Sequence, residues 1–507
     1  MSKKIKHALI SVYDKKGLDE ILVTLNKLNV SFISTGGTKE YIEQLGYECE
    51  SVEDITGYPP ILGGRVKTLH PKIFGGILYR RDNESDKKII KSYDIPSIDL
   101  VIVDLYPFEK TMASGASHEE IIEKIDIGGI SLIRAGAKNY NDVLMVASKN
   151  QYAPLLELLK EKEGASELND RKWFAKKAFG ISSAYDSAIF SYFTGNDDIT
   201  SFRVVANEGM KLRYGENPHQ KGYFFGNFNT MFDQLHGKEI SYNNLLDIEA
   251  AVELIADFDE TSVAIIKHNN ACGLASRDNL LKAWTDALAG DPISAFGGII
   301  ITNKEVDKET AEEMDKLFFE IIIAPAYNAD ALEILKQKKN RIILIQKQTK
   351  GGSSYKYRSL LNGVLAEDKN NSVQVASDLE VVTKTAPTAN ETEDLLFANK
   401  MVKHLKSNAI ALVKNKQLIG IGTGQTSRVD ALKQAIDKAK QMNLTLDGAV
   451  MASDAFFPFS DSVKIAHKAG ITSIIQPGGS IRDDESIDYC NNNGVSMVTT
   501  GIRHFKH

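Results

Sequence analysis

A lysine and a histidine stand side by side in the segment IIKHNNACGLA, residues 265–275, directly after a run of β-branched residues. That run, 263–266, favours a buried strand, so the pair falls at a strand end. In a pocket, the neutral imidazole of His268 can accept a proton from a weak amine nucleophile. The ammonium of Lys267 can stabilise developing negative charge or protonate a leaving nitrogen. The alternative is a histidine with ordinary hydrogen bonds beside a surface lysine.

Glycine-rich turns near the N-terminus favour binding of an anion. The segment FISTGGTKE places Thr35, Gly36, Gly37 and Thr38 between a strand-like run and a helix-like run. Glycines let several backbone N–H groups point at one ligand, and the helix N-terminus adds positive potential. The alternative for this segment alone is an ordinary β-to-α turn with a threonine N-cap.

A second loop strengthens the expectation of an anion site. In ILGGRVKTLHPKIFGGIL, residues 61–78, two Gly-Gly pairs bracket a cluster of Arg65, Lys67, Thr68, His70 and Lys72. A solvated basic helix face would show helical spacing, whereas glycines and a proline interrupt this cluster. The pattern therefore favours a loop that recognises an anion.

Polar side chains also follow the strand-like runs of the N-terminal region. Asp104 and Tyr106 end the run in DLVIVDLYPFEK, and Asp126 precedes a Gly-Gly pair in KIDIGGISLIRAGAKNY. Lys138 lies at the end of the helix-like run that follows. Open α/β sheets bind ligands at the carboxyl ends of their strands, so these groups and Lys67 are expected to converge on one crevice. For Asp126 the alternative is a helix cap.

The C-terminal region offers an arginine in a turn and a group of aromatic rings. Arg213 lies in KLRYGENPHQ, and its planar guanidinium suits a phosphate. In SDAFFPFSDS, three phenylalanines stand between two acidic residues. Such spacing is typical of a core, but the flanking acids and the proline favour a loop that presents rings to a flat ligand. Dinucleotide and ATP-binding fingerprints are incomplete or missing.

Strand-like and helix-like runs alternate along the chain, which predicts an α/β protein. Runs at 7–13, 30–34, 97–106 and 142–148 are separated by helical patterns, as in a parallel sheet with helices on both faces. Residues 150–196 favour helices and are followed by the polar segment TGNDDITS. We predict one domain over 1–198 and a second region over 199–507, with two subdomains divided near 345–380.

Composition narrows the class of protein. The chain has 507 residues and a net charge of −6, which argues against a protein that coats nucleic acid. Its three cysteines are far apart and form no metal-binding spacing, and they suit the reduced cytoplasm. No apolar stretch approaches the roughly 20 residues of a membrane helix. We expect a cytoplasmic protein with no membrane span and no catalytic metal.

Together these motifs closely resemble those of a family of bifunctional purine-biosynthesis enzymes. Its members combine aminoimidazole carboxamide ribonucleotide (AICAR) formyltransferase with inosine monophosphate (IMP) cyclohydrolase. The shared segments cover essentially the whole chain and include SVYDKKGL, STGGT, GGRVKTLHP, DLYPFE, IDIGGISLIRAGAKN, LRYGENPHQ, KHNNACG, DPISAFGG, SDAFFPF, QPGGSIRD and GIRHF. The resemblance implies a methylglyoxal-synthase-like N-terminal domain and two cytidine-deaminase-like subdomains, without the H-x-E and P-C-x-x-C zinc motifs.

The resemblance also implies two successive reactions. The C-terminal region would move a formyl group from 10-formyltetrahydrofolate to the 5-amino group of AICAR, and the N-terminal region would close the product to IMP with loss of water. His268 would accept the amine proton, and Lys267 would stabilise the oxyanion or protonate the folate nitrogen. The residues expected around the nucleotide are Arg213, Tyr214, Asn244, Gly297, Glu320, Asn408, Arg428 and Arg503. Those expected on the folate side are Phe456, Asp461 and Ser480.

Ring closure needs less catalytic force, because both reacting groups belong to one molecule and orientation supplies much of the rate. By resemblance, Lys138 is the leading general acid or base, with Lys67, Tyr106 and Asp126 activating the amide and formyl groups. The residues expected to grip the nucleotide are Lys15, Thr35, Gly36, Gly37, Thr38, Arg65 and Thr68.

Rival functions differ in what they require. A binding protein that senses a purine intermediate would keep the anion sites but would not need Lys138, Lys267 or His268. A single-activity enzyme would show degenerate motifs in one half, whereas both halves are intact. The resemblance further implies a homodimer with a formyltransferase site shared across the interface. Direct nucleic-acid binding lacks a basic stripe with interleaved aromatics.

Overall fold

A computed structural model describes residues 2–195, 201–206, 209–347 and 354–507. The chain divides into two units, Met1–Glu208 and Gly209–His507. The domain boundary predicted at 198/199 lies outside the described residues. Among the residues that the structure describes, no helix is long and apolar enough to cross a membrane.

The N-terminal unit is built on a five-stranded parallel sheet in the order β4-β3-β2-β5-β6. Its strands are β2 (His7–Ser11), β3 (Ser31–Ser34), β4 (Cys49–Ser51), β5 (Leu100–Val103) and β6 (Leu144–Val146). All four side chains of β5 are buried, as expected of a strand that helices cover on both faces. The short strands β1 (Lys3–Lys4) and β7 (Ala165–Ser166) pair apart from this sheet.

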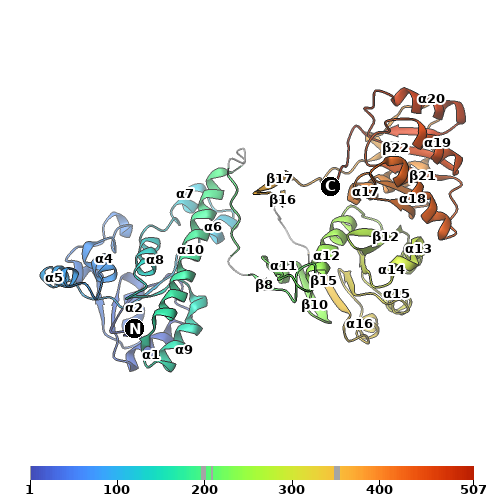
Figure 1. Cartoon of the computed structure of the whole chain (residues 1–507). Coiled ribbons are helices and arrows are strands. Elements are labelled where there is room, and N and C mark those ends of the chain that lie inside the picture. The colour runs from blue at the N-terminus through green and yellow to red at the C-terminus, as the bar shows by residue number, and fades with distance from the viewer. Residues whose placement is uncertain (1, 196–200, 207–208, 348–353) are drawn as a thin grey trace. The chain divides into compact units, whose positions relative to one another are not determined.

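Helices cover both faces of that sheet. They are α1 (Leu18–Lys27), α2 (Gly36–Gln44), α3 (Val52–Thr56), α4 (Pro71–Leu78), α5 (Glu84–Ser92), α6 (Phe108–Ala113), α7 (His118–Ile122), α8 (Gly128–Lys138), α9 (Tyr152–Glu161) and α10 (Leu168–Thr194). Helix α1 buries Leu18, Ile21, Leu22 and Leu25, the spacing of an amphipathic helix. Helices α1 and α9 pack on one face, and α4 and α8 on the other. The long helix α10 runs along the unit (Figure 1).

The C-terminal unit contains a twelve-stranded mixed sheet. Its first half consists of β10 (Phe232–His236), β15 (Ile342–Gln346), β14 (Ile321–Ala324), β13 (Ile299–Thr302), β11 (Ser262–Lys267) and β12 (Asn270–Ser276). Its second half consists of β20 (Gln417–Gly422), β19 (Ile410–Lys414), β21 (Ala449–Ser453), β22 (Ile471–Gln476), β23 (Ser496–Thr499) and β18 (Glu380–Val381). The halves join at one residue pair, Ala275 with Gln417.

The helices of this unit follow the same division. The first half carries α11 (Phe228–Met231), α12 (Tyr242–Ile255), α13 (Leu280–Gly290), α14 (Pro292–Ala295), α15 (Lys308–Met314) and α16 (Ala329–Leu335). The second half carries α17 (Ala389–His404), α18 (Arg428–Gln441), α19 (Asp461–Lys468) and α20 (Asp483–Asn493). Helices α12 and α17 contribute to one shared core, against which Phe228 of α11 also packs, while the others pack in a separate core for each half.

The two halves repeat one topology. In each, an antiparallel hairpin (β11–β12 or β19–β20) has its first strand paired with a third strand, β13 or β21. Two parallel strands and an antiparallel edge strand complete each half.

The first half ends at Gln346 and the second begins at Glu380. Between them lies the hairpin of β16 (Tyr355–Leu360) and β17 (Gly363–Asp368), while 348–353 are outside the described residues. Near the start of the unit, β8 (Met210–Lys211) pairs with β9 (Tyr223–Phe224).

Candidate active sites

A cavity of about 830 Å³ opens at the carboxyl ends of β2, β3 and β5 in the N-terminal unit. Its walls are formed by the loops that follow these strands, the loop before α4, and the segment from the end of α7 to the N-terminus of α8. Nine of the eleven residues that the resemblance implies for the cyclisation site line it: Lys15, Thr35, Gly37, Thr38, Arg65, Lys67, Thr68, Tyr106 and Asp126. Asp104, also expected at this crevice, lines it as well. The structure therefore brings the glycine-rich turn, the basic loop and the strand-end residues together.

Asp126 is held firmly at this cavity. It is 8% exposed, its Oδ1 accepts the Gly129 N–H at 2.6 Å, and its own N–H donates to the Tyr185 hydroxyl at 2.9 Å. Burial raises the pKa of the Asp126 carboxyl, although the Gly129 N–H and the charge of Lys67 oppose that shift. The carboxylate is thus both a helix-capping group, as the alternative predicted, and a member of the cavity wall.

Tyr106 belongs to an aromatic pair beside a cation. Its ring lies 5.7 Å from that of Tyr13 and nearly perpendicular to it, and Lys124 Nζ is 5.8 Å from the Tyr106 ring centroid. Burial and the nearby charge of Asp126 raise the pKa of the Tyr106 phenol. Sequence reasoning overlooked Lys124, although it stands only two positions before Asp126 and lines the same cavity.

The hydroxyl groups of the cavity are not equivalent. Thr38 Oγ1 donates to Val12 O at 3.0 Å and accepts from Val12 N at 3.2 Å, so this hydroxyl fixes the turn. Thr35 and Thr68 are buried to the same degree and also face the cavity. They are the better candidates for side-chain donors to a ligand. Arg65 lies at the rim, paired with Glu123.

Gly36 and Lys138 are absent from the cavity wall. Gly36 is the first residue of α2, next to the lining residue Gly37. Lys138 is exposed at the last position of α8, whereas the first turn of that helix lines the cavity. An α-helix of this length spans about 15 Å, so the structure does not bring Lys138 to Asp126. The role of Lys138 stays a prediction from the resemblance.

In the C-terminal unit, His268 and Asn269 form the two-residue turn of the β11–β12 hairpin, with φ values of 52° and 61°. Such a turn needs left-handed conformations at both positions, which cost non-glycine residues of order 1 kcal/mol each. His268 is exposed, and Lys267 Nζ donates to Phe296 O. A Cβ at Gly297 would lie 3.3 Å from Lys267 Nζ, so glycine leaves room for this ammonium.

A second group of predicted residues lies close to this turn. Glu320 Oε2 accepts from Asn244 Nδ2 at 3.3 Å and from Lys238 Nζ at 3.0 Å. Asn244 also forms the capping box of α12 with Ser241, so much of its hydrogen-bonding capacity is used within the fold. The Glu320 N–H donates to Gly298 O, next to Gly297. Gly297 therefore borders Lys267, and Asn244 and Glu320 are linked to each other and, through Gly298, to the segment that carries Gly297.

Asn408 and Arg428 lie in the second half. Arg428 is buried, pairs with the fully buried Asp454, and donates through Nε to Phe456 O at 3.2 Å. Ser407, next to Asn408, donates to the other oxygen of Asp454 at 2.6 Å. The sequence did not indicate that Arg428 has an internal carboxylate partner. Arg428 is therefore held in place before any phosphate binds.

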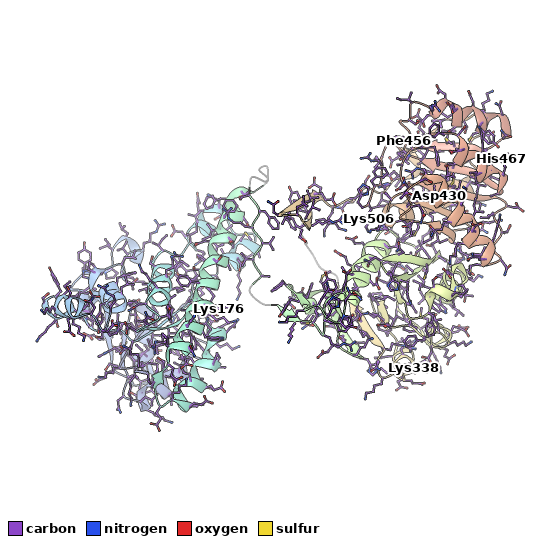
Figure 2. All side chains as sticks on the ribbon, in the orientation of Figure 1. Lys176, Lys338, Asp430, Phe456, His467 and Lys506 are labelled. Atoms are coloured by element: carbon purple, nitrogen blue, oxygen red, sulfur yellow. The ribbon has the colours of Figure 1, made fainter. Side chains whose placement is uncertain are left out.

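The aromatic segment divides between core and surface. Phe457 is completely buried, whereas Phe456 is 37% and Phe459 52% exposed. Figure 2 shows Phe456 on the second half, where its ring is available to a flat ligand. Asp461 begins α19, and Ser480 Oγ accepts the Arg482 N–H at 3.2 Å. The segment thus contributes Phe457 to the core and exposes the rings of Phe456 and Phe459.

The C-terminal tail that carries Arg503 is anchored by a buried histidine. His504 is 2% exposed and lies 3.1 Å from both Asn370 Nδ2 and Gln374 Oε1. Farther along, the Lys506 N–H donates to Ser407 Oγ at 3.1 Å (Lys506 is labelled in Figure 2). Arg503 itself is exposed over the ring of Phe505, and Arg213 is exposed beside Tyr214.

We expect His504 to make the C-terminal unit acid-sensitive. Burial, helped by the charges of Lys403 and His404, lowers the pKa of His504 to about 4. The unfolded chain takes up this proton near its ordinary pKa of about 6.5, so stability is full above that pH and falls as pH drops towards 4. One such group changes the free energy of unfolding by at most about 1.4 kcal/mol per pH unit. Thermal melting at pH 7, 6 and 5 should fall less steeply for His504→Gln, and equal slopes in both proteins would contradict this.

A cavity of about 300 Å³ connects the two halves beside His268. Lys267, His268 and Asn270 line it from the first half, and Thr423 and Lys438 from the second. None of the predicted arginines or folate-side residues lines it. One chain thus places the predicted formyltransferase residues in two groups.

Comparison with known protein families identifies the class of protein. Residues 17–131 match the MGS-like domain family, in agreement with the parallel sheet of the N-terminal unit. Residues 136–438 match the AICARFT/IMPCHase bienzyme family. The predicted fold class is therefore confirmed: an MGS-like domain precedes an α/β bienzyme region.

Full-length relatives agree with these matches. A bifunctional purine biosynthesis protein PurH of Bacteroides thetaiotaomicron is 65% identical over 506 residues, covering 100% of this chain and 99% of the relative. Proteins of the same name from Persephonella marina and Aquifex aeolicus are 47% and 46% identical, with 99% of this chain and 100% of each relative covered. The chain belongs to the AICARFT/IMPCHase bienzyme family. It is a bifunctional enzyme of purine biosynthesis that formylates AICAR and cyclises the product to IMP.

Proposed function

We propose that the two reactions occur at separate sites, cyclisation in the N-terminal unit and formyl transfer in the C-terminal unit. The observation that carries this division is the N-terminal cavity, which gathers nine predicted residues within one unit. Lys267 and His268 lie in the other unit. Two sites in one chain match the two reactions of the family.

At the N-terminal site, Lys67, Tyr106 and Asp126 line one cavity with the turns that would hold the nucleotide. In cyclisation the carboxamide nitrogen attacks the formyl carbon, and the resulting carbinol loses water. Lys67 would stabilise the developing oxyanion, and Tyr106 would donate a proton to it. Asp126 would accept the proton of the attacking amide. Lys15, Thr35, Gly36, Gly37, Thr38, Arg65 and Thr68 would hold the ribose phosphate.

At the C-terminal site, 10-formyltetrahydrofolate would be the co-substrate. The 5-amino nitrogen of AICAR forms a bond to the formyl carbon, and the bond from that carbon to the folate N10 breaks. His268 would take the proton of the amine, and the N10 atom would gain one, with Lys267 stabilising the oxyanion between these steps. The exposed position of His268 at a turn allows it to reach a bound ligand.

The remaining residues would hold the two substrates. We propose Arg213, Tyr214, Asn244, Gly297, Glu320, Asn408, Arg428 and Arg503 for the nucleotide, and Phe456, Asp461 and Ser480 for the folate. The phosphate suits the two exposed arginines, Arg213 and Arg503. Since these residues form two groups within one chain, we propose a homodimer in which a second copy completes the site.

Gly129→Ala is expected to impair cyclisation selectively. A Cβ at Gly129 would lie 2.7 Å from Asp126 Oδ2, so the carboxylate must move. A displacement of about 1 Å can cost about 10²-fold in rate. We expect a loss of that order in the cyclisation of added formyl-AICAR, with formyl transfer to AICAR unchanged. Equal cyclisation rates for the variant and the wild type would contradict this role of Asp126.

Isotope transfer tests the whole reaction sequence. With AICAR and 10-formyltetrahydrofolate labelled with ¹³C in the formyl group, the purified protein should release tetrahydrofolate and IMP in equal amounts. The label should appear at C2 of the purine ring, because the formyl carbon bridges the two nitrogens. If the protein binds both ligands and releases neither product, the binding-protein alternative is correct. Release of labelled formyl-AICAR without IMP would instead indicate a single-activity enzyme.

A further inference from the structure

The hairpin turn that carries His268 has a counterpart in the second half of the same unit. In the β11–β12 hairpin the turn residues are His268 and Asn269, with φ of 52° and 61°. In the β19–β20 hairpin they are Asn415 and Lys416, with φ of 52° and 50°. None of these is a glycine, so both turns adopt a conformation that their residues disfavour. Each turn therefore needs support from the rest of the fold.

An aspartate supports each turn from an equivalent helix position. Asp247 lies six residues after Ser241, the N-cap of α12, and Asp394 lies six residues after Thr388, the N-cap of α17. Asp394 accepts the N–H groups of Asn415 and Lys416 at 2.7 and 2.6 Å. The Asn269 N–H donates to Asp247 Oδ1 at 2.6 Å.

The first-half turn has an additional anchor. The side-chain amide of Asn269, in the orientation that satisfies both its oxygen and its nitrogen, donates to Leu246 O and to Asp247 Oδ1, each at 3.0 Å. Burial raises the pKa of both Asp247 and Asp394, while the N–H groups that they accept oppose the shift. The two carboxylates thus have similar surroundings and similar backbone partners.

What differs is the side chain that each turn presents. Lys416 is engaged in ion pairs with Glu260 and Glu393 at 2.9 and 2.8 Å, so the second turn has a structural role. The first turn presents His268, which shares its cavity with the charged groups of Lys267, Asp291 and Lys438. We infer that Asp247 is a positioning residue for formyl transfer, which holds the His268 turn in the conformation that places the imidazole at the substrate amine.

This inference rests on the proposed role of His268 as proton acceptor. The charge of Asp247 adds to its geometric effect, since a nearby carboxylate favours the imidazolium that forms when the amine proton is transferred. The positive charges of Lys267 and Lys438 oppose this electrostatic effect of Asp247, whereas the negative charge of Asp291 adds to it. Because these charges partly cancel, we expect the geometric effect of Asp247 to be the larger one.

The test compares Asp247→Ala, Asp247→Asn and the matched control Asp394→Ala in the full-length enzyme, with His268→Ala assayed alongside. Asp247→Ala should lower kcat for formyl transfer about 10²-fold, with KM for AICAR and for 10-formyltetrahydrofolate changed less than about threefold. Asp247→Asn keeps an acceptor oxygen for the Asn269 N–H and should recover most of that loss. Asp394→Ala should lower the melting temperature at least as much, yet leave kcat within about threefold. Cyclisation of added formyl-AICAR by the same samples normalises the enzyme concentration through the N-terminal unit, and circular dichroism and thermal melting show whether the C-terminal unit is folded.

The outcomes separate this inference from the function on which it rests. If His268→Ala still transfers the formyl group, the proposed role of His268 is wrong. If His268→Ala is inactive but Asp247→Ala keeps wild-type kcat, His268 is needed and Asp247 does not position it. If Asp394→Ala loses as much kcat as Asp247→Ala, the effect is a general weakening of the sheet and the inference is overturned.

Discussion

Replacing His268 by alanine is expected to abolish formyl transfer while leaving cyclisation intact. A positioned general base contributes about 10²- to 10⁴-fold to a rate, and the 5-amino group of AICAR is a weak nucleophile that needs one. We therefore expect kcat for formyl transfer to fall at least about 10³-fold. The measurement is the release of tetrahydrofolate from 10-formyltetrahydrofolate in the presence of AICAR.

The same preparation supplies the control for this variant. The cyclisation site lies in the other unit, so added formyl-AICAR should be converted to IMP at the wild-type rate. His268→Gln is a second variant that keeps a polar side chain of similar length but cannot accept the amine proton at neutral pH. Wild-type formyl transfer in both variants would remove His268 from the mechanism.

Lys67→Ala is expected to impair cyclisation while leaving formyl transfer intact. Lys67 lines the cavity with Tyr106 and Asp126, and its charge influences the Asp126 carboxyl. Removing an electrostatic contact to a developing oxyanion costs about 10²- to 10³-fold in rate. We expect the variant to formylate AICAR normally and to accumulate formyl-AICAR, which chromatography would detect. Rapid conversion of formyl-AICAR to IMP by Lys67→Ala would contradict the site.

Lys138→Ala is the informative comparison for Lys67→Ala. Resemblance to the family predicts a loss as large as that of Lys67→Ala, whereas the position of Lys138 at the far end of α8 predicts little change. Measuring both variants on formyl-AICAR under the same conditions decides between these predictions. Their melting temperatures show whether either substitution disturbs the helix.

Local sequence patterns predict much of the fold. The buried strand β5 follows from the unbroken apolar run before Asp104, and the amphipathic spacing of α1 follows from its buried leucines and isoleucine. The N-terminal cavity was predictable in part, because Lys15, Thr35 and Tyr106 follow strands of the parallel sheet. Lys67 and Asp126 instead lie in loops between helices, where glycines beside them gave the signal. In each case the signal lies within a few neighbouring residues.

Other features depend on residues that are distant in sequence. The support of the His268 turn by Asp247 joins positions 22 residues apart, and the pairing of Arg428 with Asp454 joins positions 26 apart. The repeated topology of the two halves is carried by strand pairing and not by a visible sequence repeat. Lys124 gave no signal, since a single lysine in a loop between two helices is common on a protein surface.

The central claim is that two independent sites act in succession, and a mixing experiment tests it most directly. His268→Ala and Lys67→Ala are each incubated with AICAR and 10-formyltetrahydrofolate, first separately and then together, and IMP is measured. We predict almost no IMP from either variant alone and IMP formation in the mixture, because one variant releases the formyl-AICAR that the other cyclises. A mixture that forms formyl-AICAR but no IMP, although His268→Ala cyclises added formyl-AICAR, would contradict independent sites.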